Sequence, residues 1–296
     1  MLKIGAVYPQ VELNGDPASL DSFARTIEEM GFDHMLIYDH VVGAEPGVKR
    51  DPPLWEHGPY NSTHPFHEPM TALAYIAGIT RRLELITGIL ILPQRQTILA
   101  AKQATEVDLL SGGRLHLGVG TGWNYVEYNA LGYDFHTRGK RLDEQIPYLR
   151  RLWAEPTLTF EGRFESVDRG GINPRPRRRI PIYCGGFTEP AFARAAKLAD
   201  GFIFAADVDG AIASWARTQE LLAEQGRDVS EFRAQYMVQQ FGGDGITLDA
   251  TVDGLKRWED SGAHAASIVT MGLGFTELAQ HIDYLDEVRN RVGVNA

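Results

Sequence analysis

The adjacent pair Asp39-His40 is the strongest candidate for acid–base chemistry in the sequence. A histidine exchanges a proton near neutral pH, and a carboxylate beside it can hold one tautomer or contact a bound cofactor. The pair directly follows an apolar, strand-like run at 35–38. The structural alternative is that Asp39 caps a turn and His40 begins a surface loop. We predict an acid–base role for His40 and a supporting or cofactor-binding role for Asp39.

Three further histidines, His57, His64 and His67, crowd the segment after this pair. Their spacing lacks the H-x-x-x-H pattern with which a helix binds a metal ion. The chain has one cysteine, Cys184, so no cysteine pair can complete a zinc site and no intramolecular disulfide can form. We therefore expect no metal site, and we interpret Cys184 as a small buried residue.

A glycine-rich run, LGVGTGW at 117–123, admits several interpretations. Counted from Gly118, the third glycine of a dinucleotide-binding G-x-G-x-x-G would fall on Trp123, so that motif fails. A methyltransferase loop is disfavoured because 124–152 is polar and helical and lacks the second strand, ending in an acid, that such a fold needs. The glycines then serve to let the backbone approach a flat ring closely. Trp123 and Tyr125 either stack on that ring or pack in the interior.

A second glycine pair, Gly185-Gly186, is followed by Thr188 and by a predicted helix that opens with proline. Free N–H groups at a helix N-terminus bind anions, so this turn predicts a phosphate site with Thr188 as an added donor. The alternative is an ordinary turn that starts a helix. The basic, proline-rich segment 175–179 is interpreted as a solvated or subunit-contact loop. Because it precedes the glycine pair, it is also where we expect positive potential for an anionic cofactor tail.

The elements that must position these residues alternate between strands and helices. Short β-branched runs predict eight strands, at 4–8, 35–38, 83–92, 115–119, 180–183, 202–204, 234–239 and 266–270. Helical spacing of apolar residues recurs between most of them, for example at 20–30, 70–79, 98–110, 142–152, 191–198 and 278–288. This alternation, without a break in composition, favours an α/β fold, a parallel (β/α)8 TIM barrel that forms a single domain over 1–296. Active sites of such barrels lie at the carboxyl ends of the strands.

Two segments exceed a plain barrel, 41–67 after the second strand and 157–179 after the fourth. The latter begins with a predicted hairpin, whose strands at 158–160 and 163–165 flank a Glu-Gly turn. Long loops often act as lids or binding loops, so we expect both insertions to close over the site.

Composition limits the partners. The 296 residues include 29 Lys and Arg against 39 Asp and Glu, a formal net charge of −10, which repels phosphate backbones and argues against nucleic acid. No apolar stretch reaches the roughly 18 residues that span a bilayer, and the N-terminus reads as a strand rather than a signal peptide. We expect a cytoplasmic protein that binds a small-molecule substrate and no membrane.

The order of several motifs resembles the luciferase-like (bacterial luciferase-type) flavin and deazaflavin oxidoreductases over nearly the whole chain. The segments that carry the resemblance are GFD at 31–33, DH at 39–40, RLEL at 82–85, TGILILP at 87–93, AKQ at 101–103, LSGGRL at 110–115, LGVGTGW at 117–123, LG at 131–132, RG at 138–139, RLDE at 141–144, FEG at 160–162 and GG at 185–186. The sequence looks closest to the branch, found in actinobacteria, that uses the deazaflavin coenzyme F-420.

This resemblance implies the same barrel, a homodimer, and a cofactor at the carboxyl ends of the strands. It also implies a non-prolyl cis peptide bond at Gly88-Ile89, behind the cofactor ring. Asp39 would contact the ring edge, and His40 would exchange a proton with the substrate. The cofactor-binding positions that the resemblance implies are Asp39, Thr87, Gly88, Ile89, Thr121, Gly122, Trp123, Gly185, Gly186 and Thr188.

We therefore predict an oxidoreductase that transfers a hydride between the deazaflavin F-420 and a small organic substrate. Deazaflavin-dependent sugar-phosphate dehydrogenases of this family carry a glutamate where this chain has Trp123, which favours an apolar or aromatic substrate here. The main alternative is an FMN-dependent luciferase-like monooxygenase that uses reduced flavin and oxygen. A non-catalytic flavin-binding relative is a third possibility.

Overall fold

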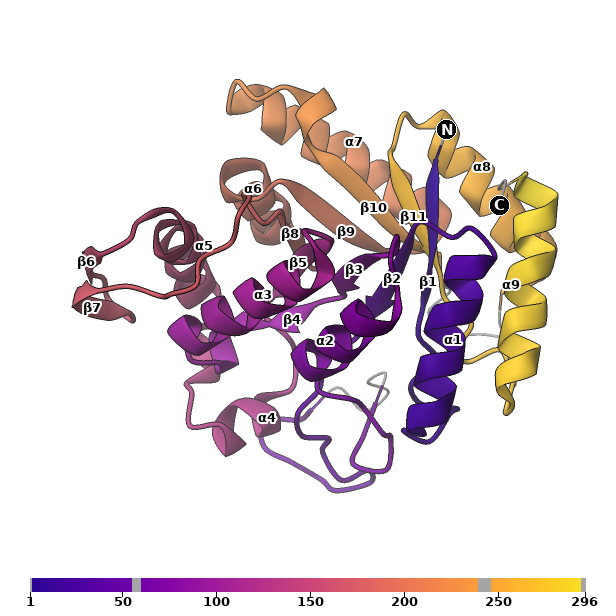
Figure 1. Ribbon diagram of the computed structural model, residues 1–296, viewed down its shortest axis with the longest axis horizontal. Coiled ribbons are helices and arrows are strands. Elements are labelled where there is room, and N and C mark those ends of the chain that lie inside the picture. The colour runs from indigo at the N-terminus through magenta and orange to yellow at the C-terminus, as the bar shows by residue number, and fades with distance from the viewer. Residues whose placement is uncertain (1, 55–59, 239–245, 294–296) are drawn as a thin grey trace.

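Parallel strands close into an eight-membered barrel in the computed structural model, which describes residues 2–54, 60–238 and 246–293 (Figure 1). The last strand pairs with the first, which closes the ring. In their order around the barrel the strands are β1 (Lys3–Val7), β2 (His34–Ile37), β3 (Glu84–Thr87) with its continuation β4 (Leu90–Ile91), β5 (Leu115–Gly120), β8 (Ile182–Gly185), β9 (Gly201–Ala206), β10 (Arg233–Val238) and β11 (Ala265–Ile268). The predicted TIM-barrel fold is confirmed.

Helices connect successive strands and surround the barrel. They are α1 (Pro17–Glu29), α2 (Pro69–Ile79), α3 (Thr97–Ser111), α5 (Arg138–Ala154), α6 (Glu189–Leu198), α7 (Val208–Glu224), α8 (Leu248–Asp260) and α9 (Leu278–Val292), with the short α4 (Tyr125–Ala130) after β5. Three single turns of 3-10 helix lie at η1 (Leu92–Gln94), η2 (Phe135–Thr137) and η3 (Val229–Glu231). None of the helices in the described part of the chain is long and apolar enough to cross a membrane.

Local sequence explains where these helices begin and end. Asp16 caps α1, because its carboxylate accepts hydrogen bonds from the backbone N–H groups of Ala18 and Ser19. Pro17 follows at the first helical position, where its missing N–H costs nothing. At the other end of a helix, Gly112 stops α3 in the left-handed conformation, with a φ of 71°.

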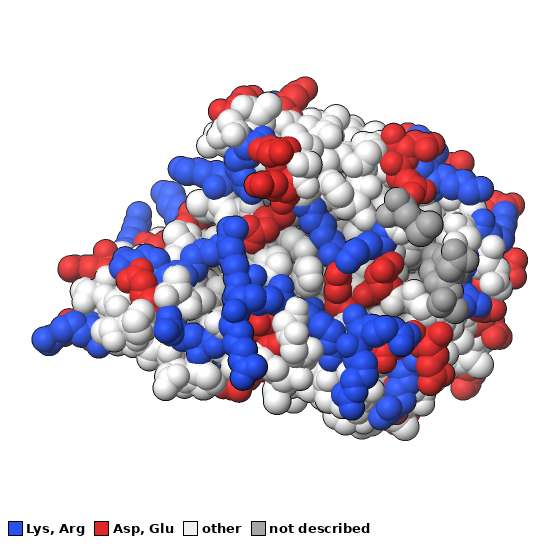
Figure 2. Space-filling model, turned by 45° about the horizontal axis from the view of Figure 1, so that its top comes forward, with Lys and Arg blue, Asp and Glu red and all other residues white. Residues whose placement is uncertain are grey.

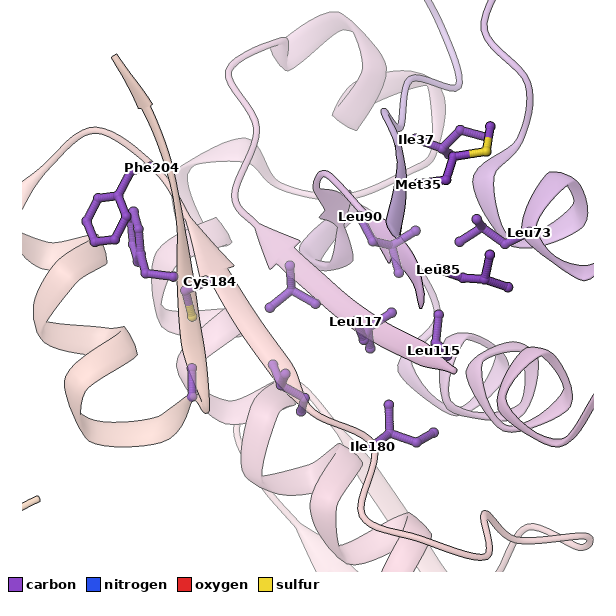
Figure 3. Packing of buried hydrophobic residues seen from close by; sticks show 14 of the residues in the cluster. Met35, Ile37, Leu73, Leu85, Leu90, Leu115, Leu117, Ile180, Cys184 and Phe204 are labelled. Atoms are coloured by element: carbon purple, nitrogen blue, oxygen red, sulfur yellow. The ribbon is translucent and has the colours of Figure 1, made fainter. Parts of the chain in front are cut away.

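Apolar side chains form two layers because alternate residues of each strand point to opposite faces. The outer layer lies between the strands and the helices, and Figure 3 shows Leu73 of α2 beside Leu85 of β3 within it. Cys184 also belongs to this layer and is buried, as predicted. The inner layer fills the barrel itself with Val7, Leu36, Ile86, Tyr183, Ile203, Ala205, Met237 and Val269.

The observed barrel strands begin or end one or two residues from their predicted bounds. The run predicted as one strand at 83–92 is interrupted between β3 and β4, at the cis peptide bond between Gly88 and Ile89 that the resemblance had implied. The strand predicted at 180–183 lies at Ile182–Gly185, because a glycine that signals a turn can also pair in a sheet. The last predicted residue of the strand at 234–239 lies outside the described residues.

The second insertion does form a hairpin, of β6 (Leu158–Glu161) and β7 (Ser166–Gly170), but its second strand begins three residues later than predicted. In Figure 1 this hairpin projects from the side of the barrel, beyond α5. The expectation that it closes over the site is wrong, because none of residues 157–179 lines the cavity described below. β6 and β7 form backbone hydrogen bonds with each other, and the hairpin packs on α5 through the stacked rings of Tyr148 and Phe160.

The basic segment 175–179 also lies away from the expected place. Arg178 forms an ion pair of 2.7 Å with Asp108 and donates to the carbonyl of Leu115, at the start of β5. Arg179 forms an ion pair of 2.7 Å with Asp200, just before β9. These contacts are at the amino ends of the strands. Figure 2, turned so that the top of Figure 1 comes forward, shows many Lys and Arg side chains interspersed with acids on this side.

Candidate active site

A cavity of about 870 Å³ opens at the carboxyl ends of the strands. This volume lies within the range of about 300–1,000 Å³ that is typical of ligand pockets. Residues from all eight barrel strands or from the loops that follow them line the cavity, as the fold predicts for an active site. All predicted site residues except Thr87 contribute to this lining, namely Asp39, His40, Gly88, Ile89, Thr121, Gly122, Trp123, Gly185, Gly186 and Thr188.

Thr87 does not reach the cavity. Its side chain is fully buried between β3 and β5, and its hydroxyl donates a hydrogen bond of 2.7 Å to the carbonyl of Gly118. Thr87 is two residues after Leu85, which packs in the outer layer, so alternation along β3 turns Thr87 away from the barrel interior. In place of the predicted cofactor contact, Thr87 links two strands.

Ile89 forms one wall of the cavity, and glycines on the neighbouring strands make room for it. A Cβ on Gly120 would lie 2.3 Å from the Cδ1 of Ile89, and a Cβ on Gly185 would lie 2.7 Å from its Cγ2. Likewise, a Cβ on Gly118 would lie 2.0 Å from the carbonyl oxygen of Thr87. The glycines of β5 thus allow close approach of protein atoms, whereas the sequence suggested direct approach to a ring. The resulting wall presents Ile89 to the cavity.

Asp39 is buried and already engaged. One carboxylate oxygen is 2.6 Å from Arg95, and the other accepts a hydrogen bond of 2.8 Å from the backbone N–H of Ile91. Burial raises the pKa of Asp39, while the Arg95 guanidinium opposes that shift. Both oxygens have protein partners, so Asp39 holds Arg95 and β4 in position.

His40 is held between two aromatic rings at the cavity wall. The ring of Tyr60 stacks on the imidazole with centroids 3.4 Å apart, and Phe66 meets it edge-on at 4.8 Å. The imidazole Nδ1 is buried and lies 3.9 Å from a carboxylate oxygen of Glu127. Stacking fixes the plane of the ring, so His40 can present a defined nitrogen to a bound molecule.

Glu127 is the main functional candidate that the sequence analysis missed. It lies on α4, is fully buried, and accepts a hydrogen bond of 3.1 Å from the Tyr60 hydroxyl. The backbone N–H groups of Val41 and Val42 donate to its other oxygen. The sequence feature that could have pointed to Glu127 is its position: it is an acid in a short helix that directly follows the glycine run at the end of β5.

Two arginines at the cavity are further residues that the analysis missed. The guanidinium of Arg138 lies 3.7 Å over the ring of Phe135, and its Nε is buried with no hydrogen-bond partner in the part of the chain that the structure describes. Arg194 on α6 is held by an ion pair of 2.6 Å with Asp143. These side chains, rather than the segment 175–179, bring positive charge to the cavity. Arg138 lies in one of the motifs that carried the family resemblance.

The turn before α6 completes a site suited to an anion. Gly186 has a φ of 152°, which side chains rarely tolerate, and a Cβ there would lie 2.8 Å from the Cβ of Ala191. Thr188 is the N-cap residue of α6, and its hydroxyl makes no capping hydrogen bond. With Arg138 and Arg194 on the same cavity, an incoming phosphate would meet a helix N-terminus, the Thr188 hydroxyl and two guanidinium groups, of which that of Arg194 is paired with Asp143.

The remaining lining is largely apolar, with a few unpartnered polar atoms. Ile203, Ala205, Met237, Val269 and Met271 form an apolar part of the lining from β9, β10 and the loop after β11. Glu12 Oε2 and His64 Nδ1 are buried and have no hydrogen-bond partner among the described residues, and both residues line the cavity. Such a surface suits a ring system or an apolar substrate, with few polar contacts to orient it. Among the described residues, no group of three or more His, Cys, Asp or Glu could hold a metal ion.

The parallel barrel thus places a largely apolar cavity, with His40, Arg138 and Arg194 on its lining, at the carboxyl ends of its strands. The sequence profile of the family described as luciferase-like monooxygenase matches residues 5–241. The chain belongs to this family of oxidoreductases and monooxygenases.

Individual relatives show how the family varies. An uncharacterised protein of Mycobacterium tuberculosis is 34% identical over 242 residues, 81% of this chain and 80% of that protein. The pyrimidine monooxygenase RutA of Pseudomonas savastanoi pv. phaseolicola is 30% identical over 231 residues, 75% of this chain but 59% of RutA. A solved F420-dependent secondary alcohol dehydrogenase, in complex with an F420-acetone adduct, superimposes with a TM-score of 0.77 over 98% of this chain and 99% of that one. At 15% identity, this last similarity shows the fold alone.

Proposed function

We propose that the protein is an oxidoreductase that transfers a hydride between the deazaflavin coenzyme F-420 and a small, apolar or aromatic organic substrate. The observation that carries the proposal is the placement of His40 at the edge of an apolar cavity, with Glu127 behind it. Exchange of a hydride with a carbinol or carbonyl carbon is accompanied by transfer of a proton on oxygen. A fixed imidazole supplies that proton transfer.

The residues present fit a phosphate-bearing ring cofactor. Gly186, Thr188 and the arginines Arg138 and Arg194 would hold the phosphate, and the buried, unpartnered Nε of Arg138 is a donor that an anion would satisfy. Ile89 would support one face of the ring. When bound, the deazaflavin accepts or donates a hydride at the ring carbon that replaces a flavin nitrogen.

The chain itself would orient the substrate and move the proton. Apolar side chains from the inner strands exclude water and fix the substrate against the cofactor. In the oxidative direction His40 takes the hydroxyl proton of an alcohol as its carbon loses a hydride, and in reverse it returns the proton. Asp39 would maintain the site by holding Arg95 and Ile91 in place.

An FMN-dependent monooxygenase is the second candidate. It is favoured by the 30% identity to a pyrimidine monooxygenase, which exceeds the 15% identity to the F420-dependent enzyme. The same phosphate site would hold FMN, because both cofactors carry a phosphate beside a three-ring system. The two functions differ in their use of oxygen.

Turnover with and without oxygen tests the proposal. The purified protein is mixed with reduced F-420 and a panel of small ketones and aromatic aldehydes, and in parallel with reduced FMN and oxygen. We expect oxidation of F-420 with formation of an alcohol at equal rates in air and under nitrogen. Oxygen consumption that depends on FMN, with an oxygenated product and no activity on F-420, would support the monooxygenase instead.

We also propose that the protein is a homodimer. Tyr75 of α2 and Ile98, Leu99 and Leu110 of α3 are large apolar side chains exposed by 40–62% on two adjacent helices. Several exposed apolar side chains on adjacent helices are typical of an interface. Light scattering of the wild type should give twice the monomer mass, and Leu99→Lys should shift the protein toward the monomer. A monomeric wild type would contradict this assembly.

A further inference from the structure

Glu127 has an unusual set of partners for a fully buried carboxylate. In the part of the chain that the structure describes, it forms no ion pair with Lys or Arg, and its ion-pair partner there is His40. Its Oε1 accepts from the backbone N–H groups of Val41 and Val42, while its Oε2 accepts from Tyr60 and faces His40. A buried carboxylate needs such donors or a counter-charge to stay ionised.

Hydrogen bonding keeps this carboxylate charged. Burial alone would raise the pKa of Glu127, but His40 and the two backbone N–H groups outweigh that effect and lower it. Tyr60 remains a neutral donor, because burial and the neighbouring Glu127 both raise its pKa. A negative charge therefore lies 3.9 Å from the Nδ1 of His40 at neutral pH.

The two nitrogens of His40 have different surroundings, although neither makes a hydrogen bond within the described residues. Nδ1 is buried and faces the Glu127 carboxylate at 3.9 Å, a distance for charge interaction rather than a hydrogen bond, and the side chain lines the cavity. The stacked ring of Tyr60 prevents the imidazole from turning freely. The nitrogen that meets a bound molecule is thus Nε2.

We propose that Glu127 is a positioning residue for the reaction, which holds the imidazole proton of His40 on Nδ1 and stabilises the imidazolium form. Nε2 then accepts a proton from the substrate, and the resulting positive charge is balanced by Glu127. This inference deepens the proposed function and rests on His40 acting as its acid–base group. It assigns a role to a residue of α4 that does not itself touch the substrate.

The other charges near His40 do not replace Glu127. Asp39 precedes His40 in the chain, but its carboxylate is neutralised by Arg95 at 2.6 Å. His64 also lines the cavity, but a neutral imidazole carries no negative charge to balance an imidazolium. Tyr60 is neutral at physiological pH and packs on the face of the ring. Glu127 of α4 is the carboxylate directed at the ring edge.

A purely structural role is the competing interpretation. Asn124 donates hydrogen bonds to the carbonyl of Val42 at 3.1 Å and to the Tyr60 hydroxyl at 2.8 Å, so α4 would anchor the loop even without a charge at 127. Glu127→Gln separates the two roles. A glutamine oxygen can still accept from Val41 and Val42, but the negative charge is lost.

The test is a pH titration of the His40 ring by NMR, with the intact protein and without cofactor. The signal is assigned by its loss in His40→Asn, and unfolding curves confirm that each variant is folded. We expect the titration midpoint of His40 to fall by about one pH unit in Glu127→Gln, a tenfold change in the proton equilibrium. Glu144→Gln is the matched control, because Glu144 also accepts three backbone N–H groups from a loop but lies outside the cavity lining.

A His40 midpoint that is the same in wild type and Glu127→Gln would overturn the proposal. If Glu127→Gln does not fold, nitrogen chemical shifts of the wild type answer the question, because they report which ring nitrogen carries the proton. We expect Nδ1–H in the neutral ring, and a proton on Nε2 would refute the assignment. Both measurements are independent of turnover. If the protein does not use F-420, the NMR result for Glu127 and His40 is unaffected. If the titration midpoint of His40 does not shift, the proposal that F-420 is the cofactor is unaffected.

Discussion

The carboxylate of Asp39 accepts a hydrogen bond of 2.8 Å from the backbone N–H of Ile91 and thereby joins the end of β2 to β4. Its second oxygen pairs with Arg95, whose guanidinium also reaches Glu68 at 3.2 Å. The buried Asp39 therefore holds the end of β2, β4 and the segment that carries Arg95 in fixed positions around the cavity. This arrangement explains why an acid follows β2 even though the adjacent His40 is the group suited to proton transfer.

Asp39→Asn should destabilise the protein by about 3–5 kcal/mol, because it leaves the largely buried Arg95 without its main counter-charge. Denaturant-induced unfolding measures the change in free energy. Glu68→Gln removes the more exposed partner of the same arginine and should cost less than about 1 kcal/mol. Equal losses in the two variants would show that Asp39 is not the dominant partner.

Gly120→Ala should disturb the cavity wall. The new Cβ would lie 2.3 Å from the Cδ1 of Ile89, so the isoleucine must shift at a cost of about 1–3 kcal/mol in stability, and cofactor affinity should fall with it. Ile89→Val removes that Cδ1 atom and should recover part of both losses in the double variant. Thermal unfolding and cofactor titration measure the two effects.

Gly78→Ala is the matched control for this substitution. Gly78 lies in α2 with open space around its Cβ position, so alanine should be neutral or stabilise the helix by up to about 1 kcal/mol. A similar loss of cofactor affinity in Gly78→Ala and Gly120→Ala would contradict the account of the wall.

The barrel and most of the site could be predicted because strand periodicity and the positions of strand ends are local properties. Asp39, His40 and Gly186 follow strands directly, so the fold alone brings them to one cavity. Glu127 could not be predicted in this way. Its partner Tyr60 lies 67 positions earlier in a loop without regular structure, and only the folded chain brings the two together.

For the basic segment 175–179, a local sequence signal led to a wrong prediction. A run of arginines before β8 was expected to serve an anion, but a loop that precedes a strand lies at its amino end, away from the site. Its guanidinium groups satisfy Asp108 and Asp200 instead. Arg194 is a single arginine on a helix, and no local signal distinguishes it from a surface residue. Arg138 lies in a motif that carries the resemblance, but that motif did not by itself assign the residue to the site.

Arg138→Gln should weaken binding of a phosphate-bearing cofactor by about tenfold to a hundredfold, the loss expected for a charge-assisted hydrogen bond. Calorimetric titration at two salt concentrations measures it, and the salt dependence of binding should become weaker. Arg175→Gln removes a charge from the basic segment, where Arg175 donates to the carbonyl of Ala154. This control should bind as tightly as the wild type, and weaker binding would show that the segment does serve the cofactor.

Stability should decline as the pH falls below about 6.5. Burial lowers the pKa of His116 to about 3, with Glu84 opposing and Arg233 assisting that shift. Between these values the unfolded chain binds a proton that the folded protein does not, so protonation favours unfolding by about 1.4 kcal/mol per pH unit. From pH 7 to pH 5 this one residue should account for about 2 kcal/mol of lost stability.

Unfolding curves of His116→Gln at the two pH values check this assignment. The variant should lose about 2 kcal/mol less than the wild type over the same interval, whatever its stability at pH 7. His136→Gln replaces an exposed histidine and should follow the wild type. An unchanged pH dependence in His116→Gln would mean that the buried histidine does not destabilise the fold in acid.

Direct binding measurements test the assignment of F-420 as the cofactor most simply. The purified wild-type protein is titrated with F-420 and, separately, with FMN, and Arg138→Gln is titrated in the same way. We expect F-420 to bind more tightly than FMN, and we expect the arginine variant to lose affinity for F-420. Tight binding of FMN with no measurable affinity for F-420 would contradict the assignment of a deazaflavin-dependent oxidoreductase.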